Sequence, residues 1–203
     1  MNYNKGFKHV QKIAKNASPG REILQGINHT GSDIISTDSH RLLTFTDNKA
    51  NFEDHIIHFK TGEIIEGNYP DTNNLIKNDD YSTEISITFE DINILRKMIK
   101  AGKTLKFDNV HLTKFEEYVE FKLVSHDKFS KNNQLNMTYT IPYKISDNSE
   151  VEPIILNLDY MIDLLDFLYD TNSDTTLKID SNIKPVHFTN EDYNYLLLPI
   201  RNI

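Results

Sequence analysis

The chain has 203 residues, of which 38% are hydrophobic and 26% charged, and its formal net charge is −8 at pH 7. This apolar content excludes a disordered chain and is enough for one large core or two smaller ones. The absence of cysteine excludes disulfides, thiolate metal sites and cysteine nucleophiles, and the acidic balance disfavours a protein that coats nucleic acid through its overall charge. No apolar run has the length of a signal peptide or membrane span, so a cytoplasmic protein without a membrane partner is expected.

The first region begins with a predicted helix over residues 7–17. Phe7, Val10 and Ile13 recur at helical spacing, and lysines occupy another face. Short alternating segments bounded by Gly, Ser and Asp then predict strands. These strands cover residues 21–30, 32–37, 41–47, 55–59 and 63–67. The polar, turn-rich stretch that follows predicts a domain boundary near residues 77–82.

The second region repeats a strand, a helix and further strands. The predicted helix, residues 89–102, turns Ile92, Leu95 and Ile99 inward and displays basic residues elsewhere. Strands are expected at residues 84–88, 104–108, 110–115, 118–126 and 137–145.

A third copy closes the chain. A strand over residues 151–157 precedes a helix over 157–170, whose polar side carries Asp159, Asp163 and Asp166, and strands follow at 176–180, 184–189 and 193–200. The repeat of strand, helix and three strands predicts an α+β fold with helices on one face of antiparallel sheets. The expected domains are residues 1–80 and 81–203.

Three short segments carry a resemblance to a known family. Residues 37–42 read TDSHRL, residues 69–72 read YPDT, and residues 195–201 read YLLLPIR. In this order, and with the repeat between them, they resemble the bacterial sliding clamp, the beta subunit of DNA polymerase III. That family has a T-D-G-H-R-L segment and a Phe-Pro-Asp-Tyr-like turn in its middle domain and ends in an aliphatic-Met-Pro-Met-Arg-like tail.

The chain departs from that family in length and at single residues. The resemblance implies that the first of three family domains is absent, that residues 1–80 form a shortened middle domain, and that residues 81–203 form a complete last domain. Ser39 replaces the family's Gly, and Asn73-Asn74 stand where a basic residue is common.

The resemblance implies a non-enzymatic processivity factor for DNA replication, and the shortened architecture favours one encoded by a phage or mobile element. Such a protein holds double-stranded DNA without reading its sequence, through basic residues on helices that line a channel. The DNA-facing residues implied here are Lys8, Lys12, Lys15, Arg96, Lys97 and Lys100. The acidic helix over 157–170 does not fit this role, and charged residues on a helix can equally form an ordinary solvated face.

The resemblance also implies a groove between the two domains that binds short peptides of the polymerase and the clamp loader, where buried Leu or Phe side chains supply affinity. The implied groove residues are Thr37, His40, Arg41, Leu42, Pro70, Leu75, Tyr143, Pro185, Leu196, Leu198, Pro199, Ile200 and Arg201. The alternative for residues 196–198 is an ordinary buried strand, and alternation predicts that Leu197 is core. A homo-oligomer, a trimer or a dimer, is expected because a ring closes by symmetry.

Two other functions compete with the clamp. A clamp mimic would bind clamp partners without encircling DNA. An unrelated α+β enzyme is disfavoured, because Asp38-Ser39-His40 lacks a nucleophile elbow and an oxyanion-forming Gly cluster. His55 and His58 lie three apart on a predicted strand and make a poor metal pair, and nucleotide-binding motifs are absent, so no metal and no cofactor are expected.

Overall fold

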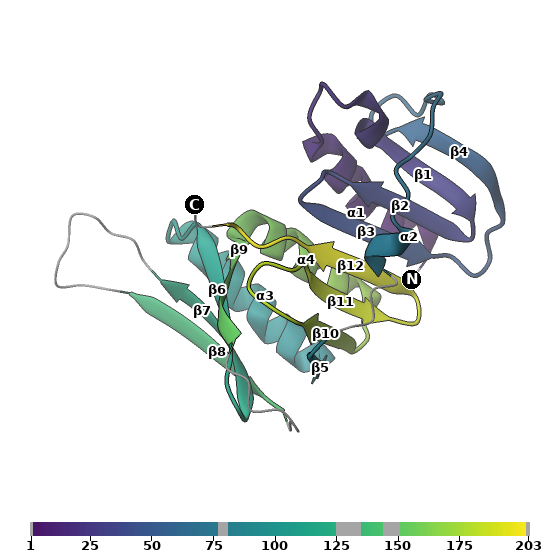
Figure 1. Cartoon of the computed structure of the whole chain (residues 1–203). Helices are drawn as coiled ribbons and strands as arrows, with labels where there is room; N and C mark the ends of the chain where they lie inside the picture. The colour runs from purple at the N-terminus through teal and green to yellow at the C-terminus, as the bar shows by residue number, and fades with distance from the viewer. Residues whose placement is uncertain (1, 77–80, 125–134, 144–150, 202–203) are drawn as a thin grey trace. The chain divides into compact units, whose positions relative to one another are not determined.

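The structure is a computed structural model that describes residues 2–76, 81–124, 135–143 and 151–201 (Figure 1). The chain divides into two compact units. The first comprises Met1–Asp80 and His187–Leu197, and the second comprises Tyr81–Val186 and Leu198–Ile203. Each is described by itself.

The first unit is a sheet with one long helix packed on it. Its elements are α1 (Tyr3–Asn16), the 3₁₀ helix η1 (Glu22–Gln25), β1 (Gly26–Gly31), β2 (Asp33–Thr37), β3 (Arg41–Thr46), β4 (Phe52–His58), α2 (Asn73–Ile76), β11 (Val186–Asn190) and β12 (Tyr193–Leu197). The strand order is β4-β1-β2-β3-β12-β11. Strand β4 is therefore an edge of this unit's sheet.

Helix α1 lies on one face of strands β1, β2 and β3. The Asn2 side chain accepts a hydrogen bond from the Lys5 N–H at 3.0 Å and caps the helix start. A Cβ atom added at Gly6 would lie 2.3 Å from the buried ring of Phe45, so glycine permits the close approach of α1 to β3. Because side chains alternate along strands, residues that neighbour Phe45 in sequence point to the other face.

The second unit contains two packed helices and a separate four-stranded sheet. Its elements are β5 (Thr83–Ile87), α3 (Phe89–Thr104), β6 (Asn109–Lys114), β7 (Tyr118–Val124), β8 (Asn136–Pro142), β9 (Val151–Asn157), α4 (Leu158–Thr171) and β10 (Thr175–Ile179). The sheet order is β8-β7-β6-β9, and β10 pairs with β5. Helices α3 and α4 pack on one another and on this sheet.

Helix ends in the second unit are set by capping residues. Thr88 and Asp91 form a reciprocal capping box at the start of α3, and Asn157 caps the first turn of α4. Asn172 ends α4 in the left-handed conformation with φ 57°.

The repeat predicted from the sequence is confirmed in chain order. Strand β5, helix α3 and strands β6 to β8 form one copy, and β9, α4 and β10 to β12 form the next. The α+β class with antiparallel sheets is likewise confirmed.

Three local predictions are wrong. Residues 104–108 form no strand, because α3 continues to Thr104 and the chain then turns at Lys106, which has φ 62°. Residues 63–67 make only an isolated bridge from Ile64 to Ile57, and Gly67 at φ 139° turns the chain away. Residues 22–25 form the helix η1, so strand β1 begins only at Gly26.

Candidate functional site

A buried ion pair fixes the turn between β2 and β3. Asp38 Oδ2 accepts a hydrogen bond from Arg41 Nε at 2.9 Å, and both side chains are fully buried. Asp38 Oδ1 accepts the backbone N–H groups of His40 and Arg41, each at 3.0 Å. Ser39, which follows Asp38 in this turn, has a φ of 77°. The Asp38 carboxylate is therefore occupied by structural contacts.

An apolar cluster lies beside this turn, on the sheet face opposite α1. Ile35, Leu42 and Leu196 form its buried part, and the half-buried side chains of Tyr69 and Ile76 pack against it. Leu42 and Leu196 are register partners across β3 and β12, so they lie on the same face. Leu197 points the other way and is fully buried, as the alternation predicts.

Tyr69 attaches the segment that covers this cluster. Its Oη accepts the Thr37 backbone N–H at 2.9 Å. Burial raises the pKa of Tyr69 to about 12, so the hydroxyl stays neutral at physiological pH. The contact holds the ring over the cluster.

The covering segment also presents apolar groups to solvent. Leu75 on α2 is 53% exposed, and Pro70 is exposed as well. Thr72 is buried, and its carbonyl accepts the Leu75 N–H at 3.1 Å, which fixes the first turn of α2. Leu75 therefore adds exposed apolar surface to an anchored segment next to the buried cluster. An apolar side chain of a ligand can pack against such a surface.

The predicted groove residues divide between the two units. Thr37, His40, Arg41, Leu42, Pro70, Leu75 and Leu196 belong to the first unit, and Tyr143, Pro185, Leu198, Pro199, Ile200 and Arg201 to the second. Within the first unit, the structure brings Leu42 and Leu196 together in the cluster. His40 is exposed, whereas the Arg41 side chain is enclosed, so Arg41 stabilises the turn and offers no open surface.

In the second unit, four of the predicted residues, Leu198 to Arg201, belong to the C-terminal tail. Leu198 and Ile200 are 40% and 39% exposed. The Ile200 N–H donates to the Ile155 carbonyl at 2.7 Å, which ties the tail to β9. Tyr143 Oη donates to the Phe115 carbonyl at 2.5 Å, and burial raises the Tyr143 pKa to about 12.

Sequence reasoning missed three members of the cluster: Ile35, Tyr69 and Ile76. Ile35 could have been found by alternation, since it precedes Thr37 by two residues on the same strand. Tyr69 was noticed only as part of a turn motif. Ile76 follows a polar run and carries no periodic signal.

A row of exposed lysines lies on α1. Lys8, Lys12 and Lys15 are exposed, as is Lys5, which the sequence reading did not include. Their spacing of three and four residues places them along one side of the helix. This side of the helix thus carries four exposed lysines although the chain as a whole is acidic.

The basic residues of α3 lie against helix α4. Asp166 Oδ1 on α4 lies 2.6 Å from Arg96 Nε and 2.6 Å from Lys100 Nζ. The Arg96 guanidinium also stacks over the Tyr169 ring, 4.3 Å from its centroid. Lys97 is exposed. Two of the three predicted DNA-facing residues of α3 are therefore already paired with a carboxylate.

The described residues contain no group of three or more His, Asp or Glu placed to hold a metal ion. His55 stacks on His29 with ring centroids 4.7 Å apart, and His58 Nδ1 lies 3.2 Å from the Thr61 nitrogen. Across the same described ranges, no helix combines the length and the apolar character needed to cross a membrane.

Comparison with solved structures identifies the class of fold. The beta clamp of Helicobacter pylori bound to a DNA ligase peptide matches with a TM-score of 0.73 at 15% identity, over 98% of this chain and 63% of that one. The DNA polymerase III beta chain of Streptococcus pneumoniae matches with a TM-score of 0.73 at 22% identity, over 98% and 63%. The sliding clamp of Bacillus subtilis matches with a TM-score of 0.71 at 20% identity, over 97% and 62%.

The chain thus has the fold of a sliding clamp. More particularly, it is similar to the beta subunit of bacterial DNA polymerase III, which confirms the resemblance inferred from the sequence at the level of the fold. It spans about 62–63% of the length of these three structures. No family model and no curated protein matches the sequence.

Proposed function

We propose that this chain is a non-enzymatic, sliding-clamp-like processivity factor that holds double-stranded DNA without sequence preference and binds short peptides of its partners. Peptide binding is supported by the apolar cluster of Ile35, Leu42 and Leu196. Tyr69 packs over this cluster, and Leu75 is exposed beside it. Burial of a Leu or Phe side chain against such a surface contributes about 1.5–3 kcal/mol. Partners of this chemistry are a polymerase and a clamp loader, and the clamp of H. pylori is seen with a DNA ligase peptide.

The lysine row on α1 supports the DNA part of the proposal. Lysines on one helical side form a local positive surface that can contact phosphates despite an acidic net charge. In this proposal the chain forms a homo-oligomeric ring, a trimer or a dimer, in the cytoplasm. Light scattering over a concentration series would show a defined oligomer, and a strict monomer would contradict the ring.

A second candidate is the clamp mimic, which binds clamp partners but does not hold DNA. The ion pairs of Asp166 with Arg96 and Lys100 favour it, because they reduce the positive surface that α3 offers to phosphates.

DNA retention separates the two candidates. The clamp reading predicts that the double variant Lys8→Glu/Lys12→Glu loses salt-sensitive retention on closed circular DNA in the presence of a loader. The control Lys49→Glu/Lys106→Glu changes charge equally at exposed turn positions outside the helices and should retain DNA. Peptide binding without DNA retention in the unmodified chain would support the mimic instead.

A further inference from the structure

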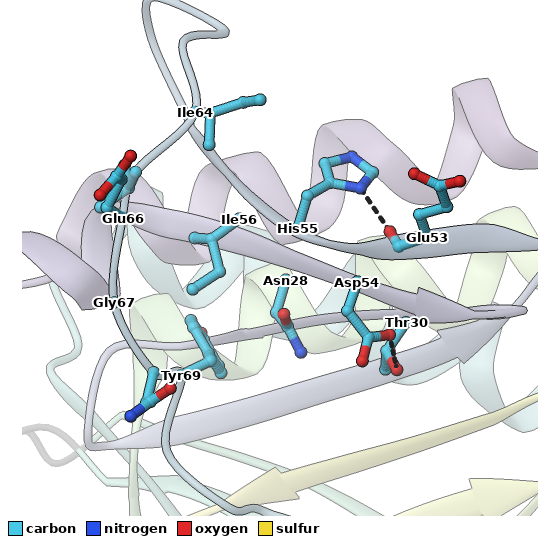
Figure 2. Close-up of a pocket in the computed structure, with 12 residues that line it drawn as sticks. Asn28, Thr30, Glu53, Asp54, His55, Ile56, Ile64, Glu66, Gly67 and Tyr69 are labelled. Atoms are coloured by element: carbon cyan, nitrogen blue, oxygen red, sulfur yellow. Dashed lines mark hydrogen bonds between the residues drawn. The ribbon is translucent and has the colours of Figure 1, made fainter.

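A groove lies in the first unit, beside the apolar cluster. It has a volume of about 880 Å³ and is lined by β1, β4 and the segment that leads to Tyr69 (Figure 2). Asn28 and Ile56 contribute to its floor from neighbouring strands, where they are register partners. None of the residues assigned to peptide or DNA binding from the sequence lines it.

The groove is acidic. Glu53, Asp54 and Glu66 line it, and its lining includes no Lys or Arg. Within the described part of the chain, no ion pair reaches any of the three carboxylates. Asp54 accepts a hydrogen bond from the Thr30 hydroxyl at 2.6 Å, which orients one carboxylate at the groove (Figure 2). Uncompensated carboxylates in a concave site favour a cationic occupant.

The groove also presents a fixed apolar group. Ile64 is 70% exposed. It is held in place by its bridge to Ile57, flanked by hydrogen bonds from His58 N–H to the Glu63 carbonyl and from Ile65 N–H to the Ile56 carbonyl, both 2.8 Å. A large side chain fixed in this exposed position can cover the aliphatic stem of a Lys or Arg residue, which combines an apolar stem with a charged end.

Tyr69 connects this groove to the apolar cluster. It lines the groove and also packs against Ile35, Leu42 and Leu196. A peptide whose apolar residue lies on the cluster therefore has its neighbouring residues beside the acidic groove, all within the first unit.

We infer that the acidic groove binds a Lys- or Arg-containing flank of the same partner peptide whose apolar residue occupies the cluster. This inference rests on the proposed peptide binding and adds the chemical class of the partner. The cluster selects an apolar anchor, and Asp54 and Glu66 select for positive charge beside it. Because exposed charge pairs each contribute modestly, the flank changes affinity by roughly tenfold rather than determining binding alone.

The test uses two series of fluorescent peptides with one Leu- and Phe-containing anchor. In one series the anchor is preceded, and in the other followed, by a flank of either lysines or serines. The lysine flank is expected to tighten binding to the unmodified chain roughly tenfold at low salt in one series. The double variant Asp54→Asn/Glu66→Gln, which leaves Glu53 unchanged, should remove most of that preference and keep the affinity for the serine peptide.

The matched control is Glu22→Gln/Glu63→Gln, which removes the same charge at exposed positions outside the groove lining and should keep the lysine preference. Equal affinities for lysine and serine peptides in both series would overturn the inference while leaving the anchor site intact. Equal loss of preference in the two double variants would also overturn it, because it would indicate a general charge effect. If no peptide of either series binds, the proposed peptide site itself fails, and this inference fails with it.

Discussion

Asp166 on α4 accepts from two cations of α3 through one oxygen atom, with Arg96 Nε and Lys100 Nζ both 2.6 Å from Oδ1. Partial burial alone would raise the pKa of Asp166, but the hydrogen bonds from Lys100 and Arg96 outweigh it and hold that pKa below its ordinary value. The carboxylate therefore stays ionised and neutralises part of a helix whose sequence predicts a DNA-facing role.

Replacing this carboxylate should strengthen DNA binding. Asp166→Asn frees two cations for phosphates, so affinity for a short duplex should rise several-fold at low salt, with a steeper salt dependence. Fluorescence anisotropy across a salt series measures both. Asp180→Asn is the control, since Asp180 pairs with Lys184 and its loss frees a cation outside α3. An equal response of both variants would mean that α3 does not contact DNA.

The Asp38–Arg41 pair should be essential for stability. Arg41→Leu leaves the fully buried Asp38 carboxylate without its cation, which costs about 3–5 kcal/mol of unfolding free energy. Arg21→Leu removes an exposed hydrogen bond to Ser39 Oγ and should cost less than about 1 kcal/mol. Urea unfolding measures both, and similar midpoints for the two variants would show that the ion pair is not needed.

The same turn contains backbone strain at Ser39. With φ 77°, Ser39 adopts a conformation that costs a non-glycine residue about 1 kcal/mol, and Ser39→Gly should recover most of it. Loss of the 2.8 Å hydrogen bond from Arg21 Nη1 reduces the gain slightly. Ser32→Gly, at a position without positive φ, should destabilise instead. A lower thermal midpoint for Ser39→Gly than for the unmodified chain would refute this account of the turn.

His29 should make the first unit sensitive to acid. Burial and the neighbouring His55 lower the pKa of His29 from 6.5 to about 4, and its Nε2 lies 3.0 Å from Tyr3 Oη. In the unfolded chain the His29 imidazole is protonated near pH 6.5, whereas in the folded chain it is protonated only near pH 4. The contribution of neutral His29 to the free energy of unfolding is therefore fully present above pH 6.5. It falls by roughly 2–3 kcal/mol as the pH drops from 6.5 to 4.

The contribution of His29 can be isolated by subtraction. In His29→Phe the difference in unfolding free energy between pH 7 and pH 4 should shrink by this amount, while carboxylate contributions remain. His58→Phe serves as the control, because His58 is only half-buried and its ring lies beside the uncharged ring of Phe59 rather than beside a second histidine. An unchanged pH profile in His29→Phe would contradict the buried, neutral histidine.

Local periodicity was sufficient to predict the long helices α1, α3 and α4 and most strands, because each long helix has a clear apolar side. The inward face of α3 follows directly from the spacing of Ile92, Leu95 and Ile99, all fully buried. The errors arose where one residue changes the backbone course. Lys106 at φ 62° turns a stretch that alternates like a strand, and the sequence contains no signal for it.

The candidate site was only partly predictable, because it depends on pairings between distant segments. Leu196 meets Leu42 across β12 and β3, a register that no local pattern specifies. Likewise, the pairing of Arg96 with Asp166 joins helices that are separated by an entire sheet in sequence. Helical faces can be predicted from sequence, but whether a charged face meets solvent or an opposite charge depends on tertiary packing.

Peptide binding beside Leu75 is the most direct test of the proposed function. Titration of a short peptide that contains Leu and Phe, monitored by calorimetry, should show saturable binding that Leu75→Ser weakens roughly tenfold. Leu105→Ser is the matched control, since Leu105 is 52% exposed where Leu75 is 53% exposed, and it should bind as the unmodified chain does. Absence of binding to the unmodified chain, or an equal effect of both substitutions, would contradict a peptide site at this cluster.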